Sequence, residues 1–267
     1  MHVFRRELQK VATLESSVFE WRRDPREPLP PSHFSVGLLR HTGVPPPRPN
    51  PMAATGSAPE TYFSHEERMF PDLDDGRIPT EQFIRACQGI ADFVGFLGTA
   101  FGPVKSDISG NVTRVKAKFE SNKALMPFLQ DLINLDLKET GGKLGDATEA
   151  LLWLKRGLEF MLELLSQMVA EYRANADHSK TESLGHIVSA AYDKSLKRHH
   201  NFVSKQIFKM VKYAVPYRRT VLKAVALGKD GLEDVCIHHI ETHLDNFRLN
   251  VHTLVEFYIA KGLETRA

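Results

Sequence analysis

Cysteine is scarce in this chain, and long apolar runs are missing from it. Only Cys87 and Cys236 occur among 267 residues, and their apolar-periodic surroundings are typical of buried, reduced thiols and not of a secreted disulfide scaffold. No run of about eighteen apolar residues is present, so the sequence predicts no membrane-spanning helix. Charged residues interrupt the first twenty positions, which is not the pattern of a secretory signal. We therefore expect a protein of the cytosol.

A large excess of charge of either sign is also missing. The chain has 35 Lys and Arg against 33 Asp and Glu, which gives a net charge of +2. A global electrostatic field of the kind that draws proteins to nucleic acid is therefore excluded, and we expect no nucleic-acid partner. Any attraction to a membrane surface must come from a local patch.

Strand-like alternation is absent from residues 79–267, where apolar residues instead recur at helical spacing. We predict helices over residues 63–70, 80–101, 104–121, 125–138, 146–170, 187–215, 220–226 and 232–261. We expect Gly102 and Pro103 to end the second of these helices, and Pro216 to end the helix of residues 187–215. The predicted fold is all-α, a bundle of about eight helices in two packed layers.

Proline is concentrated between residues 25 and 51, which excludes a strand ladder or a long helix there. We expect residues 1–58 to be a mostly disordered extension and residues 59–267 to be the folded domain. A short amphipathic pattern, Leu8, Val11, Leu14, Val18 and Trp21, either docks on a partner or a membrane or has no role. Met52 is an alternative initiator, and the sequence leaves both starts open.

The predicted helix of residues 104–121 has an unusual polar face. Asp107, Asn111, Arg114 and Lys118 recur at i, i+4, i+7 and i+11. A carboxylate, an amide and a cation on one face supply the acceptors and donors that a neutral polyhydroxylated group needs. The same spacing is that of an ordinary solvated helix face with one ion pair, and spacing alone favours this simpler interpretation.

Three blocks, in order along the chain, resemble the signatures of the glycolipid transfer proteins. The first is VKSDISGNVTRVK at residues 104–116, and the second is LLWLKRGLEF at residues 151–160. The third comprises Leu196, His200, Ile207, Phe208, Tyr213, Pro216 and Tyr217. The resemblance spans about residues 79–258. It implies the fold of that family, with a lipid pocket between two helical layers, and a non-enzymatic carrier of glycosphingolipids between membranes.

The resemblance also implies roles for individual residues. Asp107, Asn111 and Arg114 would bind the hydroxyls and the amide of a sphingolipid head group, Trp153 would lie beneath the first sugar, and His200 would meet the ceramide amide. An indole suits the apolar C–H face of a pyranose ring. Taken alone, Trp153 is more typical of a helical core, and His200 is more typical of an exposed helix face.

His200 is preferred to its neighbour His199 because of its spacing to Phe208 and its position in an apolar stripe. That stripe consists of Leu196, His200, Val203, Ile207 and Met210. The resemblance further implies a pocket for the lipid chains, lined by Phe160, Leu196, Phe208 and Leu244. Each of these is also compatible with an ordinary core.

Membrane docking is predicted around the end of the helix of residues 187–215. Aromatic and cationic residues gather there: Phe202, Lys205, Lys209, Lys212, Tyr213, Tyr217, Arg218 and Arg219. The family has a tryptophan at the position of Phe202, so we expect weaker insertion. The family's C-terminal aromatic is missing because the chain ends Glu264-Thr-Arg-Ala267. The sequence therefore leaves open whether the C-terminus contacts the head-group site.

Three positions favour a sugar over a phosphate head group. Carriers of ceramide 1-phosphate in this superfamily have cations where this chain has Asn111, Trp153 and Gly157, and a phosphate favours bidentate cations. The family's lysine is Arg114 here, which keeps the charge and changes the donor geometry. The alternatives are a ceramide 1-phosphate or other sphingolipid carrier, and a lipid sensor or adaptor that binds without shuttling.

Two other classes of function remain as rivals. An enzyme would use Asp107 and His200 as an acid/base pair with Ser109 or Ser195 as a nucleophile, but the sequence has no nucleophile elbow or glycine-rich phosphate loop. A metal site would use His239 and His243, with His238 nearby, but no third ligand is evident and solvent-facing histidines are favoured. We therefore expect no cofactor, no metal and no catalysis, a glycosphingolipid as the ligand, reversible membrane contact and a monomer.

Overall fold

A computed structural model describes residues 59–265 of the chain. The predicted N-terminal extension, its short amphipathic pattern and the alternative start at Met52 lie outside the described residues. Both cysteines are buried and unpaired, as predicted. None of the helices in residues 59–265 combines the length and the apolar content that crossing a bilayer requires.

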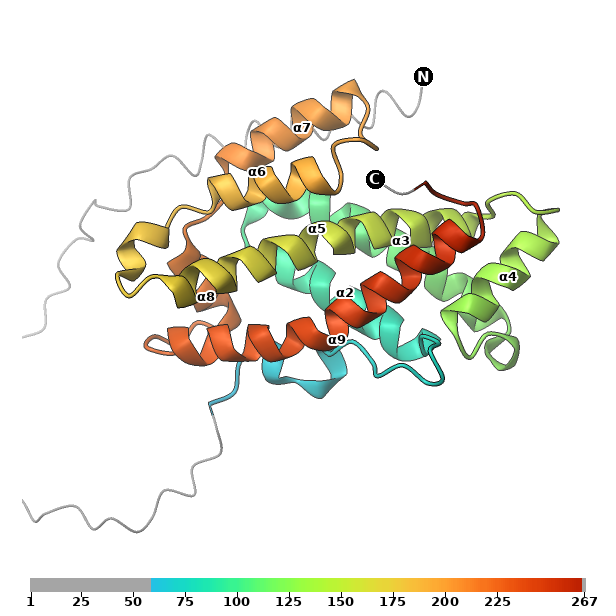
Figure 1. Cartoon of the computed structure of the whole chain (residues 1–267), viewed down its shortest axis with the longest axis horizontal. Helices are drawn as coiled ribbons and strands as arrows, with labels where there is room; N and C mark the ends of the chain where they lie inside the picture. Colours follow the sequence, from blue (N-terminus) through green and yellow to red (C-terminus); the bar gives the residue numbers. More distant parts are fainter. Residues whose placement is uncertain (1–58, 266–267) are drawn as a thin grey trace, which may run out of the picture.

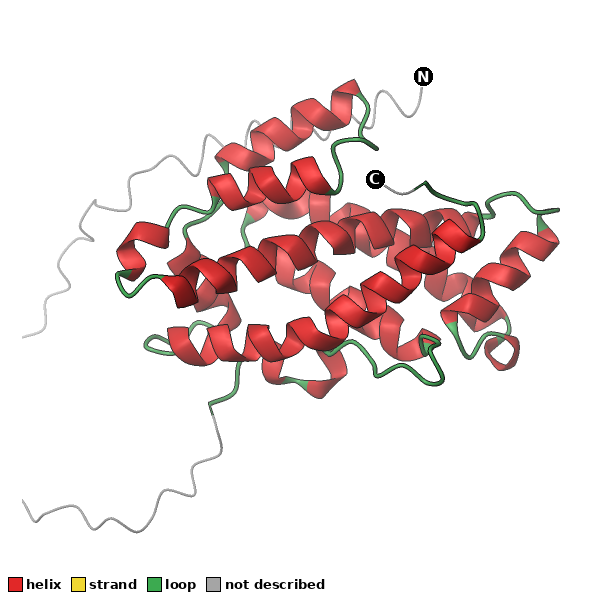
Figure 2. Cartoon of the chain, in the orientation of Figure 1, coloured by secondary structure: helices red, strands yellow, loops and turns green. Residues whose placement is uncertain are grey.

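Eight α-helices make up most of the described chain (Figure 1). They are α2 (Thr80–Phe96), α3 (Gly102–Ser121), α4 (Leu129–Glu139), α5 (Asp146–Ala174), α6 (Gly185–Lys194), α7 (Phe202–Tyr213), α8 (Arg218–Val225) and α9 (Glu233–Ala260). Residues 59–265 contain no strand beyond two isolated bridge pairs, and Figure 2 shows helices joined by short loops. The prediction of an all-α fold with about eight helices is confirmed.

Helix α5 is the centre of the bundle. It packs against α3, α4, α6 and α9, while α2 packs against α3 and α8. In Figure 1, α2 and α3 lie behind α5 and α9, so the helices form two layers. The sequence explains this position, because α5 is apolar over more than half of its circumference and such a helix must be covered on several sides. Tyr258 of α9 donates a hydrogen bond to the backbone oxygen of Thr148, 2.7 Å away, and fixes α9 on α5.

The boundary between the first two long helices differs from the prediction. Helix α2 ends at Phe96 and not at about Phe101, and Gly98 turns the chain with a φ of 111°. Gly102 and Pro103 do not stop a helix but begin α3. Proline is well tolerated in a first turn, because the N–H that it lacks has no intrahelical partner there.

The predicted helix of residues 187–215 is wrong, because the structure divides it into α6 and α7. Residues 195–201 form a turn, and Asn201 begins the second helix by accepting a hydrogen bond from the backbone N–H of Ser204 at 2.9 Å. The predicted apolar stripe through Leu196, His200 and Val203 crosses this break, so those residues do not share one helix face. An asparagine N-cap competes with continuation of a helix, and the apolar periodicity does not reveal it.

Two smaller boundaries also differ. Residues 62–68 form two 3₁₀ turns in place of a short helix, and α4 begins at Leu129, four residues later than predicted. The preceding residues are held by Thr80, whose hydroxyl donates to the backbone oxygen of Met126 at 2.8 Å. Gly141 and Gly142 follow α4 with positive φ angles, which glycine adopts at no steric cost.

Candidate functional site

The polar residues of α3 form a hydrogen-bonded row. The side-chain amide of Asn111 donates to the backbone oxygen of Asp107 at 3.0 Å, and Arg114 donates to the side-chain oxygen of Asn111 at 3.3 Å. Asn111 is buried, whereas Asp107 is exposed. The buried amide distinguishes this face from an ordinary solvated one. Lys118, the fourth residue of the pattern, instead pairs with Glu139 and, at 3.8 Å, with Asp136.

The cation in this row is neutralised by the first turn of α5. Arg114 donates through Nε and Nη2 to one carboxylate oxygen of Asp146, at 2.9 and 2.6 Å, and through Nη2 to Glu149 at 3.3 Å. These hydrogen bonds raise the pKa of Arg114, and the bond from Arg114 lowers the pKa of Asp146. The site therefore has a guanidinium that is held in place and already paired.

The ion pairs of Arg114 and Lys118 fasten α3 to two neighbouring helices. Lys118 pairs with residues that precede α5, while Arg114, one turn earlier in α3, pairs with Asp146 and Glu149 in the first turn of α5. The two cations thus hold the second half of α3 at the start of α5. Asn111, which Arg114 contacts, lies one turn before Arg114 on α3, and α3 packs along α5, the helix that carries Trp153.

Trp153 lies beside Arg156 of its own helix and beside His200 of the turn between α6 and α7. Its indole is partly buried, the guanidinium of Arg156 lies 4.7 Å from the ring centroid, and the His200 ring lies 6.5 Å away at 33°. Nδ1 of His200 is 3.1 Å from the hydroxyl oxygen of Tyr192 on α6. The structure therefore brings Trp153 and His200 together, as the resemblance implied. Tyr192 is an additional residue of this cluster that the sequence did not single out.

The aromatic residues predicted to line a lipid pocket also meet. The ring of Phe160 on α5 lies edge-on to that of Phe208 on α7, with centroids 6.2 Å apart, and Phe208 stacks on Tyr192 at 3.5 Å. Leu196 is partly buried in the turn between α6 and α7, and Leu244 is buried in the core face of α9. Their role in holding lipid chains stays a prediction.

The C-terminal segment makes a contact that the sequence left open. Gly262, with a φ of 68°, ends α9 and turns the chain so that Glu264 lies against α5. Its carboxylate pairs with Lys155 at 2.5 Å, accepts a hydrogen bond from Nε of Arg156 at 2.8 Å, and lies 2.7 Å from Nη2 of Arg156. His199 Nε2 lies 3.4 Å away. The C-terminus is therefore connected to Trp153 through Arg156, although the family's aromatic residue is missing.

The charges in this cluster are set by burial and pairing. Burial disfavours the charged form of Glu264, but the hydrogen bonds from Lys155 and Arg156 outweigh it and lower the pKa of this carboxyl group. Burial, followed by the nearby Arg156 charge, lowers the pKa of His199 to about 4. Glu264 is thus ionised and His199 neutral at pH 7. A sequence pattern gives no sign of this network, because Arg156 and Glu264 are 108 residues apart.

Helix α7 exposes most of the predicted membrane-docking residues. The exposed fractions are 75% for Phe202 at its beginning and 80% for Tyr213 at its end, and Lys205 and Lys209 are exposed between them. Lys212, Tyr217 and Arg219 are exposed as well. In Figure 1, α7 forms one outer edge of the bundle.

Arg218 does not belong to this surface. Only 3% of the residue is exposed, because its guanidinium donates to the backbone oxygen of His178 and to Glu182 at 2.8 Å. It connects α8 to the segment before α6, so the prediction of a docking role for Arg218 is wrong.

Ser195, considered as an enzyme nucleophile, and His243, considered as a metal ligand, are both buried in the structure. Ser195 is buried and donates its hydroxyl to the backbone oxygen of Ala191 at 2.7 Å. His243 is fully buried among Phe63, Phe70 and Phe247, so the expectation of a solvent-facing histidine is wrong at this position. His243 lies on the same face of α9 as the core residues of that helix. Among residues 59–265, no three or more potential metal-ligating side chains are close enough to hold a metal ion.

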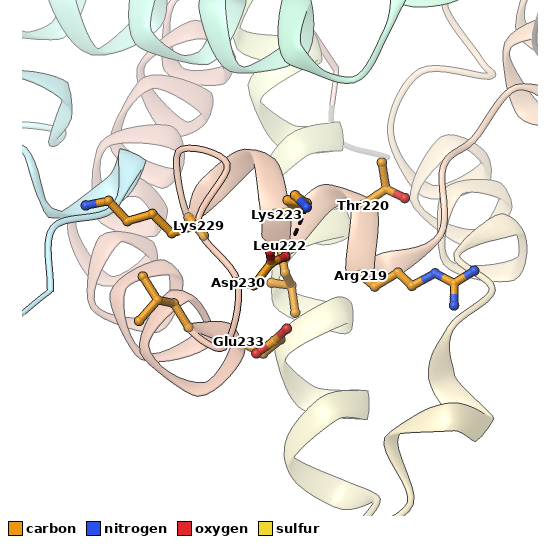
Figure 3. A pocket seen from close by; sticks show the side chains of 9 residues that line it. Arg219, Thr220, Leu222, Lys223, Lys229, Asp230 and Glu233 are labelled. Carbon is orange, nitrogen blue, oxygen red and sulfur yellow. Dashed lines mark ion pairs between the residues drawn. The ribbon is translucent and has the colours of Figure 1, made fainter. Parts of the chain in front are cut away.

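A separate hollow of about 340 Å³ lies between α8 and the start of α9 (Figure 3). Charged side chains dominate its rim, and Lys223 and Asp230 pair across it at 3.0 Å. It includes none of the residues predicted for the head group or the lipid chains. The charged side chains on its rim do not suit a hydrocarbon chain.

Comparisons with known proteins agree with the all-α fold. The family model described as "Glycolipid transfer protein (GLTP)" matches residues 78–227. The glycolipid transfer protein of Danio rerio is 32% identical over 200 residues, which cover 73% of this chain and 93% of that protein. A solved structure of FAPP2, described as showing how this protein selects simple glycosphingolipids with the GLTP fold, is also similar. Its TM-score is 0.66 and its sequence identity is 30%, over 77% of this chain and 98% of that chain. HET-C2, a fungal glycolipid transfer protein, has a TM-score of 0.60 and 29% identity, with coverage of 75% and 93%.

Proposed function

This chain belongs to the glycolipid transfer protein family, and from that premise we propose that it is a non-enzymatic carrier of glycosphingolipids between membranes. One observation supports this proposal above the others: the polar row of α3 is joined through Arg114 to the first turn of α5, the helix that carries Trp153, and His200 lies beside the indole. Hydrogen-bonding groups and an aromatic surface, the combination that a sugar ring requires, therefore lie on two helices that pack against each other.

Asp107, Asn111 and Arg114 would bind the head group. A side-chain amide has two donor hydrogens and two acceptor positions. The contacts of Asn111 with Asp107 and Arg114 use one of each and orient the amide, which leaves one donor and one acceptor for a sugar. Because Asn111 is buried, a head group that failed to satisfy it would lose about 1 to 3 kcal/mol.

The paired state of Arg114 favours a neutral head group. Asp146 and Glu149 already balance its charge, so an added phosphate would meet two carboxylates as well as the guanidinium. A sugar hydroxyl accepts or donates a hydrogen bond without adding charge. The fixed guanidinium therefore orients a sugar by hydrogen bonding and attracts an anion only weakly.

The need for a carrier follows from the hydrophobic effect. A ceramide with roughly thirty methylenes would expose apolar surface at about 0.8 kcal/mol each, or roughly 24 kcal/mol in all, so unassisted desorption is very slow. An interior lined by Phe160, Leu196, Phe208 and Leu244 would replace the bilayer at nearly equal free energy. The contact between Phe160 and Phe208 must open to admit a chain. No covalent step is needed.

Transfer also requires a brief contact with a membrane, and α7 is suited to it. Exposed aromatic residues at both of its ends, with lysines between them, allow shallow insertion without a deep anchor. We infer that the protein works as a monomer in the cytosol and docks transiently through Phe202, Lys205, Lys209, Tyr213 and Tyr217.

Two experiments test the proposed function. In the first, fluorescent glucosylceramide moves from donor to acceptor vesicles, and the protein should accelerate its transfer in proportion to protein concentration. In the second, native mass spectrometry of the purified chain identifies any lipid that it retains. Absence of both transfer and bound sphingolipid would refute the proposal, while a bound glycolipid without transfer would instead indicate a sensor or adaptor.

A further inference from the structure

The carboxylate of Glu264 lies between the two cations that follow Trp153 in the sequence. Lys155 and Arg156 both pair with it, and only 5% of the Glu264 side chain is exposed. Lys155, with 1% exposed, has a second carboxylate partner in Glu159 at 2.9 Å. Arg156 pairs with no carboxylate other than Glu264 in the described part of the chain. The charge beside Trp153 therefore depends on a single residue of the C-terminal segment.

Arg156 is close enough to the site for its charge to matter. Its guanidinium lies 4.7 Å from the centroid of the Trp153 ring, and 13% of its side chain is exposed. A partly buried guanidinium that lost its carboxylate would be strongly attracted to another anion, because arginine binds carboxylate and phosphate with the same bidentate geometry. Neutral His199 does not replace the missing negative charge.

We propose that Glu264 is a specificity-determining residue that keeps Arg156 neutralised beside Trp153, so that the head-group site rejects anionic sphingolipids such as ceramide 1-phosphate. This inference rests on the proposed function and names a determinant of its ligand selectivity. Glu264 neutralises Arg156, just as Asp146 and Glu149 neutralise Arg114. Arg114 in the predicted head-group site and Arg156 beside Trp153 then both have protein carboxylates as partners.

The test compares two lipids with the same ceramide and different head groups. Vesicle transfer of fluorescent glucosylceramide and ceramide 1-phosphate is measured with the full chain and with Glu264→Gln. The substitution keeps the shape of the side chain and removes its charge. We expect the ratio of ceramide 1-phosphate to glucosylceramide transfer to rise roughly tenfold, the effect of about one charge-assisted hydrogen bond.

Glu159→Gln is the matched control. It removes a carboxylate from the same buried lysine but leaves the pair between Glu264 and Arg156 intact, so the transfer ratio should stay at the wild-type value. An equal rise in both variants would mean that any lost carboxylate near Lys155 has this effect, and it would overturn the inference.

A second variant covers the case in which Glu264→Gln does not fold, because a buried lysine has lost a partner. In Lys155→Met/Glu264→Gln the lysine is replaced by an apolar side chain of similar size, a change that is often tolerated, while Arg156 remains unpaired. The same rise in ratio is expected, with folding checked by circular dichroism. An unchanged ratio in a folded variant, or loss of both lipids, contradicts the selectivity role. A wild-type protein that transfers neither lipid contradicts the proposed function instead.

Discussion

Arg114 on α3 and Asp146, the first residue of α5, are joined by two hydrogen bonds to a single carboxylate oxygen. The pair fixes the polar row of α3 in register with the helix that carries Trp153. It also places an acidic residue at a helix N-terminus, where the helix dipole favours negative charge. One interaction thus aligns two helices and neutralises the cation of the proposed site.

Asp146→Asn should weaken glycolipid binding without unfolding the protein. The Asp146 side chain is 74% exposed, and a surface ion pair contributes at most about 1 kcal/mol, so the midpoint of thermal unfolding should barely change. Arg114 would keep Glu149 but lose its fixed position, and transfer of glucosylceramide should fall several-fold. Asp131→Asn, which weakens an exposed pair with Arg77 elsewhere, is the control and should transfer normally. Equal rates in both variants would argue against an aligning role.

Trp153→Ala and Asp107→Val should each abolish glycolipid transfer while the helical circular dichroism stays intact. Trp153 is only partly buried and Asp107 is exposed, so neither change opens a large cavity in the core. Trp153→Phe should retain part of the activity, because a smaller aromatic ring still offers an apolar face. Wild-type transfer rates in the alanine and valine variants would refute the site.

Phe202→Ala should slow transfer between vesicles and leave the affinity for glycolipid unchanged. Its side chain is 75% exposed at the start of α7, so its removal costs membrane insertion and not stability. Leu249→Ala, also exposed but on α9, is the matched control. Sedimentation with vesicles measures docking directly. The docking surface would have to lie elsewhere if both variants bound vesicles and transferred lipid like the wild type.

Stability should decrease in mild acid because of His243. Burial lowers the pKa of this histidine to about 4, while an unfolded histidine titrates near 6.5. Between these values the unfolded chain binds the proton and the folded chain does not. The free energy of unfolding therefore decreases as the pH is lowered from 7 toward 4. This group should contribute a loss of about 2 kcal/mol between pH 7 and pH 5.

Urea denaturation of His243→Met at pH 7 and pH 5 checks this expectation. The variant should show a pH-dependent loss that is about 2 kcal/mol smaller than in the wild type. The residues packed against His243 are Phe63, Met69, Phe70 and Phe247, which carry no charge that would alter the sign. A remaining dependence is expected from His199, whose pKa is also lowered. An unchanged pH dependence would mean that His243 is not neutral in the folded state.

Helices with a regular apolar repeat were predictable from the sequence, but the break between two consecutive helices was not. The apolar stripes of α5 and α9 predicted the central layer, because a repeat near 3.6 residues persists over many turns. The break between α6 and α7 was missed because Leu196, His200 and Val203 continue the apolar phase across it by coincidence. Asn201, an N-cap residue, was the available signal.

The row of Asp107, Asn111 and Arg114 was found for the same reason, since its members are neighbours on one helix. Contacts between distant segments have no such periodic signature. Glu264 reaches Arg156 only because Gly262 reverses the chain after α9, and Tyr192 approaches His200 only because a turn follows α6. A glycine after the last helix predicts a turn there, but it does not identify the partner of the following residues.

Asn111→Lys should weaken the binding of sugar lipids and admit ceramide 1-phosphate. The substitution replaces the amide between Asp107 and Arg114 by a cation at a buried position, where the donor and the acceptor of the amide are both lost. Asp146 and Glu149 remain engaged with Arg114, so the new charge would be balanced best by an anionic head group.

The measurement for Asn111→Lys is competition between glucosylceramide and ceramide 1-phosphate in the same vesicles. Thr113→Lys, which adds the same charge at an exposed position of α3, is the control for effects of charge on the helix as a whole. An unchanged preference in Asn111→Lys would show that the buried amide does not read the head group. A preference that reverses only in this variant, with glucosylceramide transfer reduced, would show that one side chain on α3 separates neutral from phosphorylated cargo.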